Sequence, residues 1–421
     1  FLEVHIQKKK TKKDGVQMNN TNSNNNVIKT SKLANAIEPS ITMEITSLAK
    51  SLKASGQDVI GFGAGEPDFD TPDFIKEAAK KAIDDGKTKY TPAAGIQELK
   101  EAICEKFKAD QGLDYKPENI VVSCGAKHTI YNLLLALVDA GDEVLIPSPY
   151  WVSYPDQVRL AGGTPVIVEA DESTSFKLTP SILKAAITPK TKILMLNSPS
   201  NPTGMVYSRD ELNALAPILE ENNITILSDE IYEKLVYSGQ EHISIATLSE
   251  SLKNQTIVIN GVSKAYSMTG WRIGYCAAPV NVAKGMSKIQ SHSTSNPTTP
   301  SQWASIEALK HGEKDIERMK VSFDERRLKM VELLNNIDGI SCVEPKGAFY
   351  AFPNVSGCFG MTSKTGIKIK SSKDFCSALL QEALVACVPG IGFGEDTCIR
   401  FSYATSMRDI ENGLQRLADW V

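Results

Sequence analysis

The chain has 421 residues, of which 42% are hydrophobic and 23% charged, and its formal net charge is -4. This length exceeds what one ordinary core holds, so we expect two domains, and the composition is typical of a soluble globular protein. The slightly acidic balance argues against nucleic acid as a partner, and no apolar run reaches the roughly 18 residues that a membrane span needs.

The N-terminal residues differ in composition from the rest of the chain. Residues 7–13 are rich in lysine and residues 19–26 are rich in asparagine. Neither stretch can bury apolar surface, so we predict a disordered tail over residues 1–30. Because the chain begins with Phe1 and its start is basic and poor in acid, we expect the remnant of an organelle transit peptide. A functionless solvated tail is the alternative.

From about residue 75, helical and strand-like patterns alternate. Helical periodicity covers residues 75–85, 99–110, 126–138 and 209–221, and short apolar runs cover residues 119–123, 143–146, 192–196, 224–227 and 256–259. This alternation predicts an α/β fold in which a mostly parallel sheet lies between layers of helices. We expect this large domain to span residues 71–315. A long charged helix from about residue 315 and mixed shorter elements predict a small α+β domain over residues 316–421. Residues 31–70 would form an N-terminal arm and part of this small domain.

Eight cysteines and five histidines are spread along the chain without the CxxC or HxxxH spacing of a metal site. Reduced thiols fit a reducing compartment. We therefore expect no metal ion.

Polar residues follow four of the predicted strands. They are residues 125–127, 197–204, 228–230 and the pair Ser263-Lys264. In parallel sheets, ligands bind outside the carboxyl ends of the strands. The sequence therefore predicts a ligand site at this edge of the sheet.

Lys264 and Arg272 indicate which ligand to expect. Lys264 follows the strand predicted at residues 256–259, and Arg272 lies eight residues further on. A lysine amine can form a Schiff base with an aldehyde, and a guanidinium can hold a phosphate; pyridoxal 5'-phosphate carries both groups. Two solvated cations beside a turn would also explain the pair in isolation. We predict that Lys264 forms the aldimine and moves the proton of the substrate Cα.

Three residues suit the ring of this cofactor. Asp229 ends a predicted strand and can pair with the pyridine nitrogen, although a helix N-cap is an alternative role for it. Tyr232 and Asn201 can each donate to the phenolic oxygen. The segment around Asn201, rich in proline and glycine, is by itself only a turn.

The remaining candidates would hold the phosphate and stack on the ring. Gly125, Ala126 and Lys127 follow a strand and open a helix, where backbone N–H groups and the helix dipole bind phosphate. Such turns are common, and Arg272 would supply the counter-charge. Trp151 can stack on the pyridine ring and contact the substrate, although a buried tryptophan is more often core.

Arg400 suggests how the substrate is held. It is a lone arginine within the apolar run Ile399 to Phe401. Burying a guanidinium is costly unless an anion meets it, and a substrate α-carboxylate would do so in a bidentate manner. An arginine at the exposed edge of a sheet is the alternative.

With these residues the chain resembles a fold-type I, pyridoxal phosphate-dependent aminotransferase of the class I/II superfamily. The matching segments are residues 64–69, 89–91, 149–152, 201–204, 228–232, 263–264 with Arg272, and 400–402, and the resemblance covers about residues 33–421. Within the superfamily the chain is most similar to subgroup 1β aspartate aminotransferases, and especially to the plastid enzymes that also accept prephenate. Residues 148–155, 270–272 and 402–406 carry that likeness.

The resemblance implies further roles. It implies an obligate homodimer in which Tyr90 reaches the cofactor phosphate of the neighbouring subunit, and a substrate contact through the backbone of Gly65. Asn201 would also contact substrate. Thr42 and Lys127 match residues associated with prephenate use.

Two positions depart from the family pattern. Glu38 stands where relatives often carry a lysine, which affects recognition of the distal carboxylate of the substrate. Gly261 stands where other branches carry a phosphate-binding serine, so we expect other donors, such as Ser263, to complete the phosphate site.

We therefore predict ping-pong transamination between aspartate or glutamate and 2-oxo acids, namely 2-oxoglutarate, oxaloacetate and prephenate. An aromatic or alanine aminotransferase on the same fold is the first alternative, and a non-catalytic binding module on this fold is the second. The likeness to plastid enzymes predicts the chloroplast stroma, with the cytoplasm or mitochondrion as alternatives.

Overall fold

The computed structural model describes residues 28–37, 39 and 41–421, apart from the side chains of Met43 and Thr46. The predictions made for residues 1–27 and for Glu38 lie outside the described residues.

The described residues divide into two compact units, residues 28–37 and the residues from 39 to 421. In the first unit the short helix α1, Lys32–Ala36, is capped by Ser31, whose Oγ accepts a hydrogen bond from the backbone N–H of Ala34 at 3.1 Å. All the remaining elements belong to the second unit.

The second unit contains a seven-stranded sheet. In spatial order its strands are β2 (Ile120–Ser123), β8 (Gly274–Ala277), β7 (Thr256–Gly261), β6 (Thr225–Asp229), β5 (Thr191–Asn197), β3 (Glu143–Ser148) and β4 (Thr164–Glu169). Strands β7, β6, β5, β3 and β4 pair in parallel, and β8 is antiparallel to both of its neighbours. The predicted mostly parallel sheet is confirmed. Strands β4 and β8 were not predicted; β4 is an edge strand with exposed residues and a proline, and β8 has four residues and starts with glycine.

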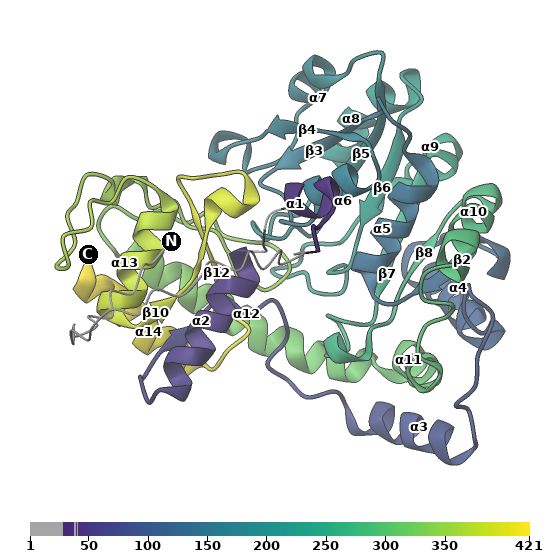
Figure 1. Cartoon of the computed structure of the whole chain (residues 1–421), viewed down its shortest axis with the longest axis horizontal. Helices are drawn as coiled ribbons and strands as arrows, with labels where there is room; N and C mark the ends of the chain where they lie inside the picture. The colour runs from purple at the N-terminus through teal and green to yellow at the C-terminus, as the bar shows by residue number, and fades with distance from the viewer. Residues whose placement is uncertain (1–27, 38, 40) are drawn as a thin grey trace, which may run out of the picture. The chain divides into compact units, whose positions relative to one another are not determined.

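Helices cover both faces of this sheet (Figure 1). Val144 and Ile146 of β3 face the core formed with α5 (Ala126–Leu137), α6 (Tyr154–Leu160) and α10 (Val280–Ser291). Leu145, between them, faces the core formed with α7 (Pro180–Ala186), α8 (Arg209–Glu221) and α9 (Glu250–Gln255). Successive strand residues point to opposite faces, so a strand covered on both sides must be apolar throughout. This explains the uninterrupted apolar runs in the sequence.

A third helical group packs on β2, β8 and β7. Helix α11 (Thr299–His311) packs against α3 (Asp73–Asp84) and α4 (Gln97–Gln111), and all three contribute to one core. The predicted helices at residues 75–85, 99–110, 126–138 and 209–221 are therefore confirmed within a few residues at their ends.

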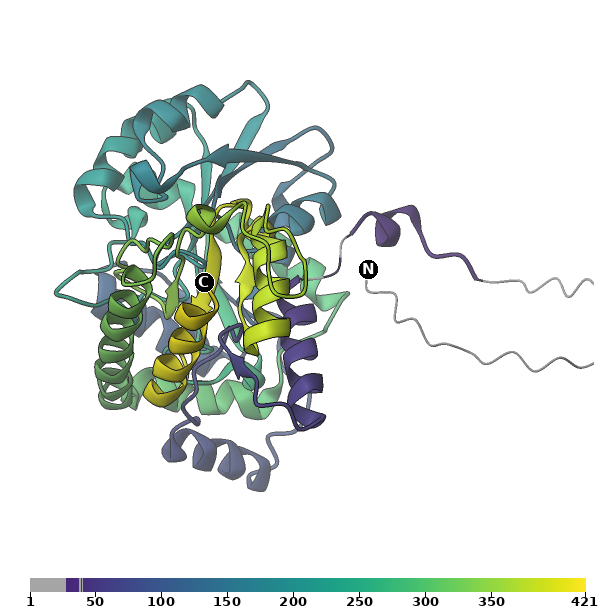
Figure 2. The ribbon, with the colours of Figure 1, turned by 90° about the vertical axis from the view of Figure 1, so that its left-hand side faces the viewer.

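The C-terminal part has its own small sheets. Strands β11 (Val388–Pro389), β12 (Ile399–Ser402) and β9 (Tyr350–Ala351) form an antiparallel sheet with β12 in the centre, and β1 (Ile60–Gly61) pairs in parallel with β10 (Val385–Ala386). The predicted long charged helix is α12 (Glu313–Asn335). Helix α14 (Met407–Trp420) lies between α12 and α13 (Ser372–Ala383) (Figure 2). Helix α2 (Ile41–Ala54) contacts β10 and β11.

Across the described ranges, no helix is both long enough and apolar enough to cross a membrane.

Candidate active site

Lys264 lies in the turn that follows β7, at the carboxyl edge of the large sheet. Its Nζ donates a hydrogen bond to the carbonyl oxygen of Gly65 at 2.6 Å. Burial is the main reason that the pKa of Lys264 falls to about 8; the Glu66 carboxylate opposes this fall, and Arg400 and Arg272 add to it. An amine with this pKa is partly neutral near neutral pH, and only the neutral form is a nucleophile or a base.

Asp229 is the last residue of the neighbouring strand β6 and is buried. Its Oδ2 accepts a hydrogen bond from the phenol of Tyr154 at 2.7 Å, and its Oδ1 accepts one from the backbone N–H of Ile231 at 3.3 Å. A turn at residues 231–234 follows, not a helix, so the alternative role of Asp229 as a helix N-cap is wrong. Burial raises the pKa of Asp229 to about 6. A carboxylate in this environment is suited to meet a cation.

Tyr154 is a site residue that the sequence did not reveal. It is the first residue of α6 and is buried, and its ring packs edge-on against Trp151 with the ring centroids 5.3 Å apart. The sequence shows that Trp151 and Tyr154 are three positions apart. The contact between Tyr154 and Asp229, 75 residues apart, is not visible in the sequence.

Tyr232 lies close to the catalytic candidate. Its ring centroid is 5.9 Å from Lys264 Nζ, and its hydroxyl shares a hydrogen bond of 2.9 Å with the hydroxyl of Tyr350 on β9. Burial raises the pKa of Tyr232 well above its usual value, so the phenol stays protonated and can donate. Tyr350 was not predicted as a site residue.

Arg400 lies on the central strand β12 and is only 3% exposed, so the alternative of an exposed edge arginine is wrong. Its Nη1 donates to Asn201 Oδ1 and its Nη2 donates to the carbonyl oxygen of Gly63, each at 2.9 Å. Its Nε is buried and has no hydrogen-bond partner among the described residues, and the guanidinium lies 4.5 Å from the ring centroid of Tyr350. Burial lowers the pKa of Arg400. No carboxylate of the described chain pairs with this cation in the structure, so an anionic ligand would stabilise it.

Arg272 lies against the start of α5, as the phosphate hypothesis requires. Its Nη1 donates to the carbonyl oxygen of Thr269 at 2.8 Å, and its Nη2 donates to that of Cys124 at 3.4 Å. Gly125 precedes the helix with a φ of +90°, and a Cβ there would lie 2.4 Å from Arg272 Nη2. A glycine is therefore needed for the guanidinium to reach the N-terminus of α5, where free N–H groups and the helix dipole attract anions.

The glycine at position 261 has a steric cause. Gly261 on β7 pairs with Gly274 on β8. A Cβ at Gly274 would lie 2.1 Å from the backbone nitrogen of Ala126, and a Cβ at Gly261 would lie 2.9 Å from the carbonyl oxygen of Ile273. The backbone of β8 thus lies too close to β7 for a serine side chain at position 261, and the start of α5 lies too close to β8 for any side chain at position 274. Ser263, the donor expected instead, lies buried two residues beyond the strand.

The other predicted residues are placed as follows. Lys127 Nζ lies 4.8 Å from the ring centroid of Trp151, and burial, followed by Arg272, lowers its pKa. Thr42 is half-buried in the first turn of α2. Tyr90 is 90% exposed on this chain.

These groups fit pyridoxal phosphate. An amine with a lowered pKa suits the aldehyde, a buried carboxylate suits the ring nitrogen, and an arginine beside a glycine-lined helix N-terminus suits the phosphate. The unpartnered Nε of Arg400 suits a substrate carboxylate.

Comparison with known proteins agrees with this chemistry. A family model described as "Aminotransferase class I and II" matches residues 57–417. An aspartate aminotransferase of Geobacillus stearothermophilus is 52% identical over 390 residues, which are 93% of this chain and 98% of the relative. An aspartate/prephenate aminotransferase of Cereibacter sphaeroides is 51% identical over 90% of this chain and 96% of the relative. The crystal structure of an aspartate aminotransferase from Rhizobium meliloti superposes with a TM-score of 0.90 and 44% identity, over 94% of this chain and 99% of the other. The chain therefore belongs to the class I and II aminotransferases, which depend on pyridoxal 5'-phosphate.

Proposed function

We propose that this aminotransferase transfers the amino group of aspartate or glutamate to 2-oxo acids by a ping-pong mechanism. The buried guanidinium of Arg400, with its unpartnered Nε, is the observation that carries the proposal, because it calls for a carboxylate. The names of the relatives from Geobacillus stearothermophilus and Cereibacter sphaeroides support aspartate as the donor.

In this proposal each residue has one task. Bound pyridoxal phosphate supplies the electron sink that makes the substrate Cα–H acidic. Lys264 Nζ, partly neutral because of its lowered pKa, takes the proton from that Cα. Asp229, oriented by Tyr154, keeps a proton on the ring nitrogen. Arg400 and Asn201 hold the substrate carboxylate.

The remaining residues would complete the cofactor site. Arg272, Ser263 and the N-terminus of α5 at residues 125–127 would hold the phosphate, the hydroxyl of Tyr232 would donate to the phenolic oxygen, and Trp151 would stack on the ring. The backbone of Gly65, which accepts a hydrogen bond from Lys264, contacts the substrate once the lysine has moved away.

We propose prephenate as an additional acceptor. The relative from Cereibacter sphaeroides is named an aspartate/prephenate aminotransferase, and Lys127 offers a cation over Trp151 at the site. Thr42 would act with it. A Lys127→Ala variant should lose prephenate activity while it keeps activity with oxaloacetate; unchanged use of prephenate would contradict the proposal.

We also propose a homodimer with shared active sites. An almost fully exposed tyrosine is unusual on a single chain, and Tyr90 would contact the phosphate bound to the other subunit. Sedimentation would give the mass of the assembly. Mixing Lys264→Ala with Tyr90→Phe should restore part of the activity if sites are shared, since one kind of mixed site then carries neither substitution.

The division into a large domain, residues 71–315, and a small domain, residues 31–70 and 316–421, remains a proposal, supported by the separate sheets of the two parts. A chloroplast location remains a prediction; the relatives named above are bacterial. Fusing residues 1–30 to a fluorescent reporter would test it.

Steady-state kinetics with oxaloacetate, 2-oxoglutarate and prephenate as acceptors, and with aspartate, alanine and phenylalanine as donors, would test the function. We expect aspartate or glutamate to have the highest kcat/KM. A preference for a monocarboxylate donor would instead identify an alanine or aromatic aminotransferase.

A further inference from the structure

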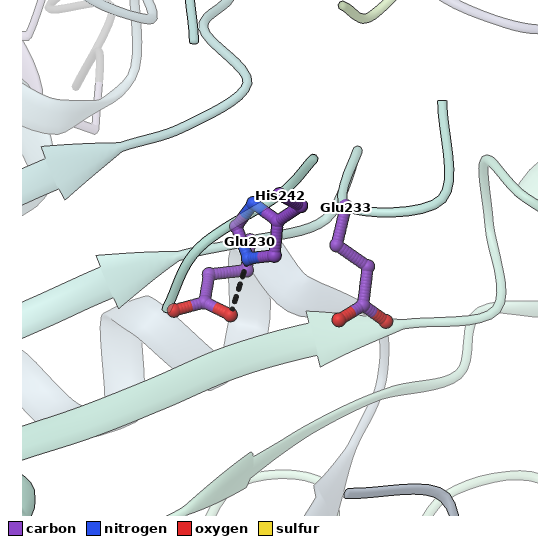
Figure 3. A group of neighbouring side chains, drawn as sticks. All are labelled: Glu230, Glu233 and His242. Carbon is purple, nitrogen blue, oxygen red and sulfur yellow. Dashed lines mark hydrogen bonds and ion pairs between the residues drawn. The ribbon is translucent and has the colours of Figure 1, made fainter. Parts of the chain in front are cut away.

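Glu230, the residue after Asp229, lies in a buried polar cluster behind the cofactor site. Its carboxylate receives hydrogen bonds from four side chains: Ser228 and Ser244 at Oε1 (2.8 and 2.6 Å), and Gln111 and His242 at Oε2 (2.9 Å each). Figure 3 shows the bond to His242 and the neighbouring carboxylate of Glu233. The donors come from β6, from α4 and from the loop around residues 242–244, so Glu230 connects three segments of the chain.

The cluster contains the residue types of a metal site, but its carboxylate oxygens already accept hydrogen bonds or ion pairs from protein groups. Oxygen and nitrogen atoms of Glu230, Glu233 and His242 lie within 4.8 Å of one another. Every carboxylate oxygen already has a donor, however: the Lys106 ammonium pairs with Glu233 Oε1, and Gln111 donates to Glu233 Oε2 at 2.6 Å. Since the Lys106 ammonium already supplies the positive charge that a metal ion would bring, we assign the cluster a different role.

Glu230 differs from the other carboxylates of the cluster in its ion pairs. Lys106 pairs with Glu233, and Lys234 pairs with Asp110 at 2.9 Å. Among the described residues, Glu230 has no lysine or arginine partner. Burial alone would raise its pKa, but His242 and the two serine hydroxyls outweigh burial and lower it, so Glu230 remains a carboxylate. A negative charge in a buried site acts strongly on its neighbours.

Glu230 also fixes the backbone that carries two site residues. Its N–H donates to the carbonyl oxygen of Ile259 on β7 at 2.9 Å, and its own carbonyl accepts from the N–H of Glu233 at 2.9 Å. Asp229 immediately precedes this anchored turn, and Tyr232 lies within it. The charge of Glu230 adds to burial, which is the larger effect, in raising the pKa of Asp229.

We infer that Glu230 is a positioning residue for the cofactor. Its carboxylate, held by Ser228, Ser244 and His242, keeps the side chain of Asp229 directed at the ring nitrogen and places a second negative charge behind it. This inference rests on the proposed function, because it requires Asp229 to meet a pyridine nitrogen.

The test compares two cofactors in the full-length apoprotein. Glu230→Gln should weaken the binding of pyridoxal phosphate about tenfold. It should leave unchanged the binding of the analogue in which carbon replaces the ring nitrogen, because that analogue offers Asp229 no proton to share. Equal weakening for both cofactors, or no weakening for either, would overturn the inference, since a general structural role cannot distinguish one ring atom.

Glu233→Gln is the matched control, because it removes the same charge from the same cluster but leaves Glu230 in place. It should lower the melting temperature while the affinities for both cofactors stay as in the wild type. If Glu230→Gln does not fold, Ser244→Ala removes one donor from Oε1 and should weaken pyridoxal phosphate alone, by about fivefold. The wild type separates the two proposals: if it binds pyridoxal phosphate and transaminates aspartate, the proposed function stands whatever Glu230→Gln shows.

Discussion

The phenol of Tyr154 donates a hydrogen bond to Asp229 Oδ2 at 2.7 Å and so fixes the orientation of a buried carboxylate at the end of β6. Burial raises the pKa of Asp229 to about 6, and this hydrogen bond works in the opposite direction because it stabilises the charged form. Burial is the larger effect, so the pKa of this carboxyl stays above its usual value despite the hydrogen bond.

Tyr154→Phe removes this hydrogen bond without changing the ring. A hydrogen bond to a charged group contributes about 1.5 kcal/mol, so the pKa of Asp229 in the apoprotein should rise from about 6 to about 7. Carbon-13 NMR of labelled aspartate would measure it. An unchanged or lower pKa would contradict the assigned hydrogen bond. Tyr131→Phe, at a half-buried tyrosine of α5, serves as the control.

Lys264→Met should abolish transamination and the visible absorbance of the bound cofactor, and it should also change the pH dependence of stability. The pKa of Lys264 is about 8 in the folded protein and 10.5 in the unfolded chain. The unfolded chain therefore binds the proton more tightly, and the wild type loses stability as the pH falls from about 10.5 to about 8.

At pH 7 the wild-type apoprotein has lost all the stability that protonation of the buried Lys264 amine removes, and the variant has no such amine. The free energy of unfolding of Lys264→Met, relative to wild type, should be about 2.5 kcal/mol more favourable at pH 7 than at pH 10. Urea denaturation at the two pH values measures this difference. Equal effects at both values would mean that burial does not perturb the amine.

Arg400→Lys should raise KM for the amino acid about 100-fold while the absorbance of the bound cofactor stays unchanged. A lysine cannot reproduce the fork that donates to Asn201 and the Gly63 carbonyl, and a bidentate carboxylate pair is worth a few kcal/mol. Arg416→Lys, at an arginine paired with Asp58, is the control and should behave as wild type. A similar loss in both variants would argue against a substrate role for Arg400.

Gly125→Ala should weaken cofactor binding more than tenfold. The new Cβ would lie 2.4 Å from Arg272 Nη2, and the φ of +90° is unfavourable for alanine, so the guanidinium or the first turn of α5 must move. Equilibrium dialysis of the apoprotein with pyridoxal phosphate would measure the affinity. At Gly270 a Cβ meets nothing within 4 Å, so Gly270→Ala should bind as wild type. If the two alanine variants bind equally well, the steric argument for Gly125 fails.

The sequence predicted a residue's position and role correctly where both depend on its neighbours along the chain. The apolar strand 256–259 followed by Ser263-Lys264 predicted both the strand and the position of the lysine at its carboxyl end, and the structure has β7 and Lys264 there. Arg400 inside an apolar run predicted a buried guanidinium, and it is 3% exposed. Strand β4 was missed although it contains the apolar run Val166 to Val168, because Pro165 beside that run argues against a central strand and is tolerated only at the edge of the sheet.

The sequence by itself determined the fold class and the set of reactive groups, because hydrophobic periodicity and strand-end chemistry are properties of neighbouring residues. Only the tertiary structure decided how these groups act on one another. Tyr154 reaches Asp229 across 75 residues, and Glu230 accepts hydrogen bonds from three segments of the chain. At Gly274, β8 lies so close to the start of α5 that a Cβ would be 2.1 Å from the backbone nitrogen of Ala126. Such contacts depend on how strands and helices pack, and no pattern along the chain records that packing.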